Sequence, residues 1–136
     1  MGYYSDVRIC TTKKGYEELN HFVSDFIKKE NLDPEFNLLD KTSVHLITDA
    51  GQQHYFGWDS IKWYEDSDSY VTAIDKGLEH LKNLEIPYEF GRIGEDIDDI
   101  TEYVTGDYNL DYIPIVRYFD DGEIKECDAK GSEDNA

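Results

Sequence analysis

The chain has 136 residues and a mass of 15.8 kDa, and its 31 acidic and 13 basic residues give a formal net charge of −18. This length suits one domain with a single core, and a 14% aromatic content argues against general disorder. The negative field repels nucleic acids and anionic membranes and attracts basic surfaces, which makes direct nucleic-acid binding the function class excluded first.

The N-terminus lacks the basic and apolar regions of a secretory signal, and no apolar run approaches the length of about eighteen residues that spans a membrane. We therefore expect a soluble protein of the cytoplasm. The two cysteines, Cys10 and Cys127, lie in no CxxC or zinc-type spacing. Reduced thiols are the expected state, and a bridge between the two is the alternative.

The first predicted element is a strand over residues 3–11. Its predicted buried side consists of Tyr4, Val7 and Ile9. A helix from about residue 14 to residue 30 follows, because apolar residues recur there at helical spacing. That stripe consists of Tyr16, Leu19, Val23, Phe26 and Ile27. Asn31 and Pro34 end the helix.

The next two runs predict a β-hairpin whose turn is Asp49-Ala50-Gly51-Gln52, since Gly51 readily adopts positive φ. This register places His45 opposite Phe56 and His54 opposite Ile47, with both imidazoles diagonally adjacent on one face. Two imidazoles are too few ligands for a zinc site, and no other His or Cys lies near them in the sequence. We expect polar residues on a sheet face, with a metal pair as the alternative.

A second helix over residues 70–84 is predicted from apolar residues at helical spacing. These are Val71, Ile74, Leu78 and Leu81. Gly77 weakens this helix by about 1 kcal/mol relative to alanine unless close packing requires its missing side chain. A strand follows near Pro87, and the Asp121-Gly122 pair predicts a hairpin between two further strands.

The element order is therefore β-α-β-β-α-β, then an acidic segment, then β-β. Short connections favour an antiparallel sheet with both helices packed on one face, which is a two-layer α+β fold. A ferredoxin-like arrangement is one option. We expect a single domain over residues 1–127 and a disordered acidic tail over residues 128–136.

The acidity is concentrated in residues 92–136, which carry 14 acidic and 4 basic residues. Within them, residues 95–111 hold seven carboxylates and no lysine or arginine, with tyrosines between them. Rows of carboxylates approach the charge density of a nucleic-acid strand. The predicted partner-binding residues are Glu95, Asp96, Asp98, Asp99, Glu102, Tyr103, Asp107, Tyr108 and Asp111, with secondary help from Glu65, Asp66 and Asp68.

The sequence gives less support to metal binding or catalysis. The acidic stretches lack the central glycine and final glutamate of an EF-hand loop, so no metal site is assigned. No nucleophile elbow, P-loop or dinucleotide-binding motif is present in the sequence, and abundant carboxylates make any acid and base pair uninformative. We therefore expect neither an enzyme nor a cofactor.

Three stretches carry a resemblance: "MGYYSDV", "KKGYEEL" and "YEFGRIGEDIDDI". They resemble segments of small acidic proteins encoded by phages and prophages. The resemblance implies a setting in which such proteins often inhibit host defence, including anti-CRISPR and anti-restriction proteins that mimic nucleic acid. The expected partner is then a basic nucleic-acid-binding protein of the host, such as a CRISPR effector or a restriction enzyme.

Two alternatives from other classes stay open. One is a structural or regulatory phage protein that associates with itself. The other is a small ligand-binding module or enzyme with a pocket between the helices and the sheet.

Overall fold

The structure is a computed structural model that describes residues 3–64, 69–105, 119, 121, 124 and 128–129. The helices and strands are β1 (Ser5–Thr12), α1 (Lys13–Lys29), β2 (Val44–Thr48), β3 (Gln53–Ile61), α2 (Ser69–Asn83), β4 (Tyr88–Ile93), β5 (Ile100–Thr105) and β6 (Asp128–Ala129). Short 3-10 turns lie at Pro34–Phe36, Leu38–Asp40 and Asp49–Gly51. Within these residues, neither helix combines the length and apolar character that crossing a membrane requires.

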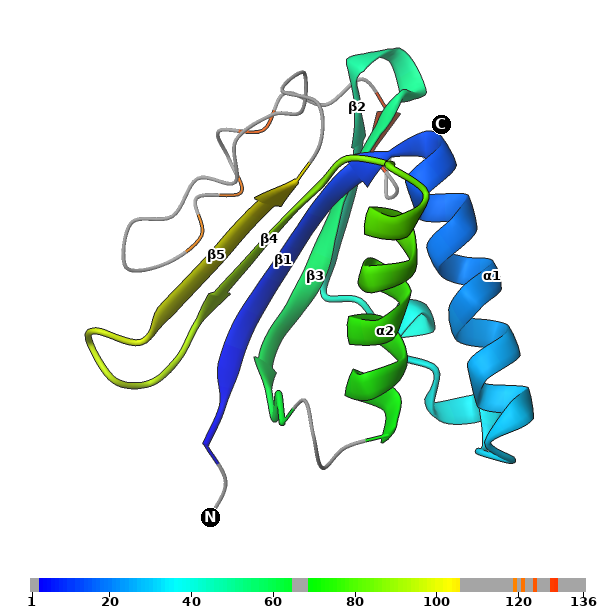
Figure 1. The fold of residues 1–136 in the computed structure, drawn as a ribbon. Coiled ribbons are helices and arrows are strands. Elements are labelled where there is room, and N and C mark those ends of the chain that lie inside the picture. The colour runs from blue at the N-terminus through cyan, green and yellow to red at the C-terminus, as the bar shows by residue number, and fades with distance from the viewer. Residues whose placement is uncertain are drawn as a thin grey trace.

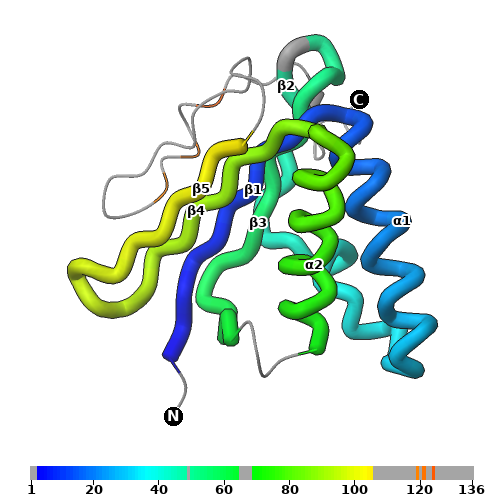
Figure 2. The backbone as a smooth tube through the Cα atoms, in the orientation of Figure 1, coloured from blue at the N-terminus to red at the C-terminus, as the bar shows by residue number. Residues whose placement is uncertain are grey.

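The sheet has the strand order β5-β4-β1-β3-β2-β6, and each pair of neighbouring strands is antiparallel. Both helices cover the same face of this sheet (Figure 1). The predicted two-layer α+β fold is therefore confirmed. The inner order β4-β1-β3-β2, with a helix connecting β1 to β2 and another connecting β3 to β4, is the ferredoxin-like arrangement. Strands β4 and β5 run side by side at the end of the sheet farthest from α1 (Figure 2).

Helix α1 begins where the sequence supplies a cap. The Thr12 hydroxyl accepts a 3.0 Å hydrogen bond from the backbone N–H of Gly15, which satisfies one of the unpaired donors of the first turn. Along the helix, Leu19, Val23 and Ile27 form the buried stripe. The helix ends before Asn31, which adopts a φ of +57°. The predicted bounds and apolar face of α1 are therefore confirmed to within one residue.

Helix α2 packs against α1 through Gly77. A Cβ atom at this position would lie 2.5 Å from Cδ1 of Leu19 and 3.4 Å from Cδ1 of Phe22. The missing side chain thus lets the two helices approach closely, which explains a glycine in the middle of a helix. The buried residues Val71, Ile74, Leu78 and Leu81 confirm the predicted face of α2.

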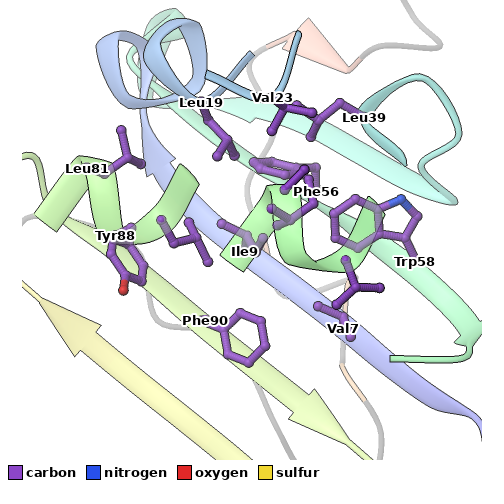
Figure 3. Close-up of a cluster of buried hydrophobic side chains, with 14 of the residues drawn as sticks. Val7, Ile9, Leu19, Val23, Leu39, Phe56, Trp58, Leu81, Tyr88 and Phe90 are labelled. Carbon is purple, nitrogen blue, oxygen red and sulfur yellow. The ribbon is translucent and has the colours of Figure 1, made fainter. Parts of the chain in front are cut away.

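The main core fills the space between the sheet and the helices (Figure 3). Val7 and Ile9 of β1 and Phe56 of β3 are completely buried there. The aromatic rings of Phe56, Trp58 and Trp63 contact each other in sequence, with centroid distances of 6.1 Å and 5.4 Å. Burial of such rings stabilises each by about 1.5–3 kcal/mol relative to exposure.

The hairpin of β2 and β3 has the predicted register, because His45 pairs with Phe56 and Ile47 pairs with His54. In the turn, Gly51 has a φ of +91°. The prediction for the first strand was wrong at Tyr4, which is 42% exposed. Strand alternation from Val7 places Ser5 on the helix side instead, and β1 has an irregularity between these two residues.

The other face of the sheet carries a second apolar cluster to which Phe119 and Ile124 contribute. These two residues pack with Cys10, Tyr55 and Ile93. Cys127 and the two strands predicted around Asp121-Gly122 lie largely outside the described residues. Phe119 and Ile124 therefore pack on the face of the sheet opposite the helices.

Strand β6 changes one expectation about the C-terminus. Asp128 pairs with Ile47 and Ala129 with Leu46, so residues 128–129 belong to the sheet. The predicted disordered tail therefore cannot begin at Asp128, and residues 130–136 lie outside the described part of the chain. Backbone pairing overrides the polar composition of this short stretch.

Arg8 is buried on this second face, with an exposed fraction of only 3%. It lies between two residues without side chains, because the register pairs Arg8 with Gly57 on β3 and with Gly91 on β4. The guanidinium forms a bidentate pair with Asp121, at 3.1 Å from Nε to Oδ1 and 3.0 Å from Nη2 to Oδ2. A 2.8 Å bond to Asp59 completes its ionic contacts.

Candidate functional site

The predicted acidic residues fall on the loop that joins β4 to β5 and on β5 itself. Residues 94–99, called the acidic loop from here on, contain Glu95, Asp96, Asp98 and Asp99. Glu102 and Tyr103 lie on β5. The acidic loop is found at the end of the sheet where the N-terminus enters (Figure 1). The remaining predicted residues, Asp107, Tyr108, Asp111, Glu65, Asp66 and Asp68, lie outside the described residues.

Backbone hydrogen bonds close the acidic loop on itself. The N–H of Gly94 donates to the Asp99 carbonyl at 2.8 Å, and the N–H of Asp99 donates to the Asp96 carbonyl at 3.0 Å. A further bond joins the N–H of Ile100 to the Asp98 carbonyl at 3.0 Å. Internal bonds of this kind reduce the conformational freedom that a binding partner would otherwise have to remove.

The N-terminal residues fasten the same loop from outside. The Tyr3 hydroxyl donates to Oδ2 of Asp99 at 2.6 Å and accepts from the Asp96 N–H at 2.9 Å. The backbone N–H of Tyr4 donates to the Glu95 carboxylate at 2.6 Å. Bonds to charged acceptors are stronger than neutral ones. The acidic loop is thus held by residues more than 90 positions away in the sequence.

Asp99 differs from its acidic neighbours because it forms an ion pair within the chain. Nη2 of Arg92 lies 2.6 Å from its Oδ1, and Nη1 lies 3.1 Å from its Oδ2. The side chains of Arg92 and Asp99 are 18% and 29% exposed. The charge of Asp99 is therefore balanced locally, and its role in the structure is to shape the loop. Glu95, Asp96 and Asp98 are the exposed carboxylates of the loop.

Strand β5 separates the two remaining predicted residues. Tyr103 pairs with Phe90, and their rings lie 5.5 Å apart on the helix side of the sheet. Glu102 pairs with Gly91 and points to the opposite face, because side chains alternate along a strand. The structure therefore gathers four predicted carboxylates in one loop, and places Glu102 and Tyr103 on different faces of the neighbouring strand.

Two hollows flank the acidic loop. The acidic hollow, of about 490 Å³, is lined by Tyr4, Asp6, Ser60, Ile93, Gly94 and Glu95. The aromatic hollow, of about 320 Å³, has four aromatic lining residues, Tyr3, Trp63, Tyr64 and Tyr103. Its other lining residues are Arg92, Asp99 and Thr101. Exposed tyrosines such as Tyr64 and Tyr103, at 38% and 51% exposure, belong to the residue types enriched at protein interfaces.

The sequence offered no signal for several of these residues. Tyr3, Arg92 and Trp63 meet at the loop only through the pairing of β1 with β3 and β4 and of β4 with β5. Their separations along the chain exceed the range of any periodic pattern. The one available hint was that Arg92 is the basic residue closest to a dense acidic run.

The histidine pair lies apart from this loop, on the helix side of the β2 and β3 hairpin. Nε2 of His45 and Nδ1 of His54 are 2.9 Å apart, so one ring donates a hydrogen bond to the other. The Tyr16 ring of α1 stacks on His54 with a centroid distance of 4.3 Å. Among the described residues, no group of three or more His, Cys, Asp or Glu side chains is arranged to hold a metal ion.

The histidine pair makes the stability of the fold depend on pH. Burial lowers the pKa of His54; the charge of Glu17 partly opposes this shift, and Lys13 adds to it. Because the folded pKa is lowered, this stability is present above the unfolded value of about 6.5 and is lost as the pH falls below it. We expect the free energy of unfolding to fall over this range, because the unfolded chain binds a proton at His54 more readily than the folded chain does.

Urea denaturation at about pH 7.5 and about pH 5 measures this fall. His54→Phe keeps a ring against Tyr16 and removes the titrating group, so it should reduce the dependence on pH. His21→Gln, at an exposed position on α1, serves as the control and should leave it unchanged. An equal fall in the wild-type protein and in His54→Phe would contradict this explanation.

Comparison of the chain with protein-family models, with curated proteins and with solved structures found no match in any of the three.

Proposed function

We propose that this protein is a phage-encoded inhibitor of a host defence enzyme that acts on nucleic acid, of the anti-CRISPR or anti-restriction kind. It acts as an acidic mimic of nucleic acid and occupies a basic groove of that enzyme. The observation that carries the proposal is the acidic loop, which presents exposed carboxylates and is held by backbone bonds of 2.8–3.0 Å and by 2.6 Å bonds to the Glu95 and Asp99 carboxylates. The net charge of −18 adds a long-range field of the same sign.

Charge spacing supports the mimicry. The acidic loop places three exposed carboxylates, Glu95, Asp96 and Asp98, within four consecutive residues. The bond from the Asp99 N–H to the Asp96 carbonyl makes this segment a turn, which keeps the three carboxylates close together. The loop therefore presents a local cluster of negative charge, the sign that a groove built for phosphates binds.

The partner under this proposal is a basic nucleic-acid-binding protein of the host cell. Electrostatic attraction steers such a partner towards the loop and accelerates association. The fixed loop reduces the entropy lost on binding. Neither a nucleic acid nor an anionic membrane suits the same surface, since both carry charge of the same sign.

A double charge reversal tests the proposal. We expect Asp96→Lys together with Asp98→Lys to weaken binding to the defence enzyme by at least about tenfold. In cells that carry this enzyme, the wild-type protein should restore plating of a sensitive phage and the double variant should not. Asp99 is left in place because its reversal would also remove the ion pair with Arg92.

A matched control reverses two exposed carboxylates on the helices, Asp25 of α1 and Glu79 of α2. This control changes the net charge by the same amount. The control variant should therefore lose some long-range attraction for the defence enzyme. Because its acidic loop is intact, it should still protect the phage. Equal loss of protection in both double variants would show that net charge alone matters, and full protection by the loop variant would refute the role of the loop. Binding should also weaken as salt rises from low to physiological concentration.

Self-association is the second candidate function, and β5 is the observation that favours it. Ile100 and Val104 lie on the face of β5 that points away from the helices, and they are 41% and 51% exposed. In the described part of the sheet, β5 is bonded to β4 alone. Sedimentation at increasing protein concentration distinguishes the candidates, because a self-associating protein grows in mass and a monomeric inhibitor does not.

A further inference from the structure

The aromatic hollow beside the acidic loop has walls that are already fixed. The Tyr64 hydroxyl accepts a 2.7 Å bond from the backbone N–H of Tyr3 and donates a 3.2 Å bond to the Tyr3 carbonyl. The phenol of Tyr3 is itself bonded to Asp99. Trp63 is only 7% exposed, and its ring lies 6.0 Å from that of Phe90 in the core. The hollow therefore exists before any ligand arrives.

The outer wall of the hollow is Tyr103, which is 51% exposed. Its ring extends the series of aromatic contacts that runs from Trp63 through Phe90, at 6.0 Å and 5.5 Å. A large aromatic side chain left half in solvent is typical of the residues that contribute most to binding energy at protein interfaces. Tyr103 was predicted as an aromatic contact residue, and in the structure it lines the aromatic hollow.

The size and charge of the hollow restrict its occupant. A volume of about 320 Å³ is at the small end of ligand sites and suits one aromatic ring. Arg92 in its wall disfavours a cation, and Asp99 together with the acidic loop disfavours an anion. Aromatic walls favour another ring, since offset or edge contacts between rings add to the gain from burial.

We propose that the aromatic hollow receives an uncharged aromatic side chain of the basic partner, carried next to the cationic residues that meet the acidic loop. The inference rests on the proposed function and adds that the partner must present an aromatic side chain beside its cationic residues. Charge complementarity identifies the source of the ring as a protein, because the exposed carboxylates of the loop attract a surface rich in lysine or arginine. The ring then supplies contacts that salt does not screen.

Two synthetic heptapeptides test this without the natural partner. They are Lys-Lys-Gly-Phe-Gly-Lys-Lys and the same peptide with alanine in place of phenylalanine. Titration calorimetry at low salt should give an affinity about tenfold higher for the phenylalanine peptide. The indole N–H resonance of Trp63 should shift with that peptide alone. The indole N–H of Trp58, which donates to the Leu38 carbonyl at 2.8 Å, should stay in place.

Tyr103→Ala should abolish the preference for phenylalanine and leave binding of the alanine peptide unchanged. Phe36→Ala is the matched control, because Phe36 is also 51% exposed but lies on the 3-10 turn Pro34–Phe36, away from the hollow. Its variant should keep the full preference. The resonance of Trp63 in the wild-type protein provides a second measurement that depends on no substitution.

Equal affinities for the two peptides, with binding that weakens as salt rises, would overturn the aromatic site and leave the charge mimicry standing. Absence of binding by both peptides would overturn both proposals. N-acetylphenylalaninamide serves as a third ligand. If it binds as tightly as the phenylalanine peptide, the hollow is a site for small aromatic molecules and the assignment to a protein partner is wrong.

Discussion

Replacing Arg8 with alanine is expected to lower the free energy of unfolding by about 1–3 kcal/mol, because the carboxylates that lose their partner, Asp121 and Asp59, are 33% and 54% exposed. The guanidinium is buried at 3% exposure and donates to Asp121, to Asp59 and to the backbone carbonyls of Val7 and Trp58. Removing it leaves Asp121 without its bidentate partner over an apolar surface.

The charges around Arg8 support one another. Burial lowers the pKa of Arg8, but the hydrogen bonds and charges of Asp121 and Asp59 outweigh it and raise this pKa overall. Burial also raises the pKa of Asp121, and the bonds from Arg8 and Tyr55 reverse this and lower it. The Tyr55 hydroxyl donates to the same carboxylate at 2.7 Å. Burial raises the pKa of Tyr55 as well. Arg8 is therefore charged, Asp121 ionised and Tyr55 neutral at neutral pH.

Urea denaturation of Arg8→Ala measures the effect. Glu18→Ala is the control, because Glu18 pairs with His80 at 3.4 Å and both side chains are more than a third exposed, at 38% and 34%. Such a surface pair contributes at most about 1 kcal/mol. Similar losses in the two variants would show that the buried network contributes no more than a surface pair.

Replacing Gly57 with alanine is expected to cost about 3 kcal/mol, at the upper end for overpacking. A Cβ atom at this position would overlap the backbone carbonyl of Val7 and lie 2.9 Å from Cα of Arg8. Backbone atoms of a paired central strand cannot move aside as a side chain can. The two strands β1 and β3 must therefore separate locally, which also disturbs the space that Arg8 occupies.

Gly51→Ala provides the comparison for this substitution. Nothing lies within 4 Å of a Cβ atom at Gly51, but its φ is +91°. The expected cost there is only the backbone strain of about 1–2 kcal/mol. Thermal and urea unfolding of the two variants separates steric overlap from strain, and equal losses would exclude the overlap as the main cause.

Local patterns account for the part of the fold that the sequence predicted. Helix α1 followed from the spacing of Leu19, Val23 and Ile27, and the register of the β2 and β3 hairpin followed from the position of Gly51. Each of these signals lies within a few turns or one hairpin of chain, where side-chain periodicity and backbone geometry decide the outcome. The two-layer arrangement then follows from the order of the elements.

The acidic segment was harder to assign because its charge concealed a strand pattern. Residues 100–105 alternate between two faces and include Ile100, Thr101 and Val104, which favour strands. The ion pair of Arg92 with Asp99 could not be predicted from the sequence either, since the turn between β4 and β5 is what brings these two residues together. Which carboxylates would remain exposed therefore depended on tertiary contacts.

The central position of β1 has a consequence for how the chain acquires its structure. Arg8 cannot form its ion pair until Asp121, 113 positions later, is present. Tyr3 likewise cannot form its hydrogen bond until Asp99, 96 positions later, is present. Contacts between such distant residues make folding slow. During translation, the earliest strand leaves the ribosome long before β4 can pair with it. The hydrogen-bonded acidic loop thus forms only late in synthesis, and a prematurely terminated chain would lack it.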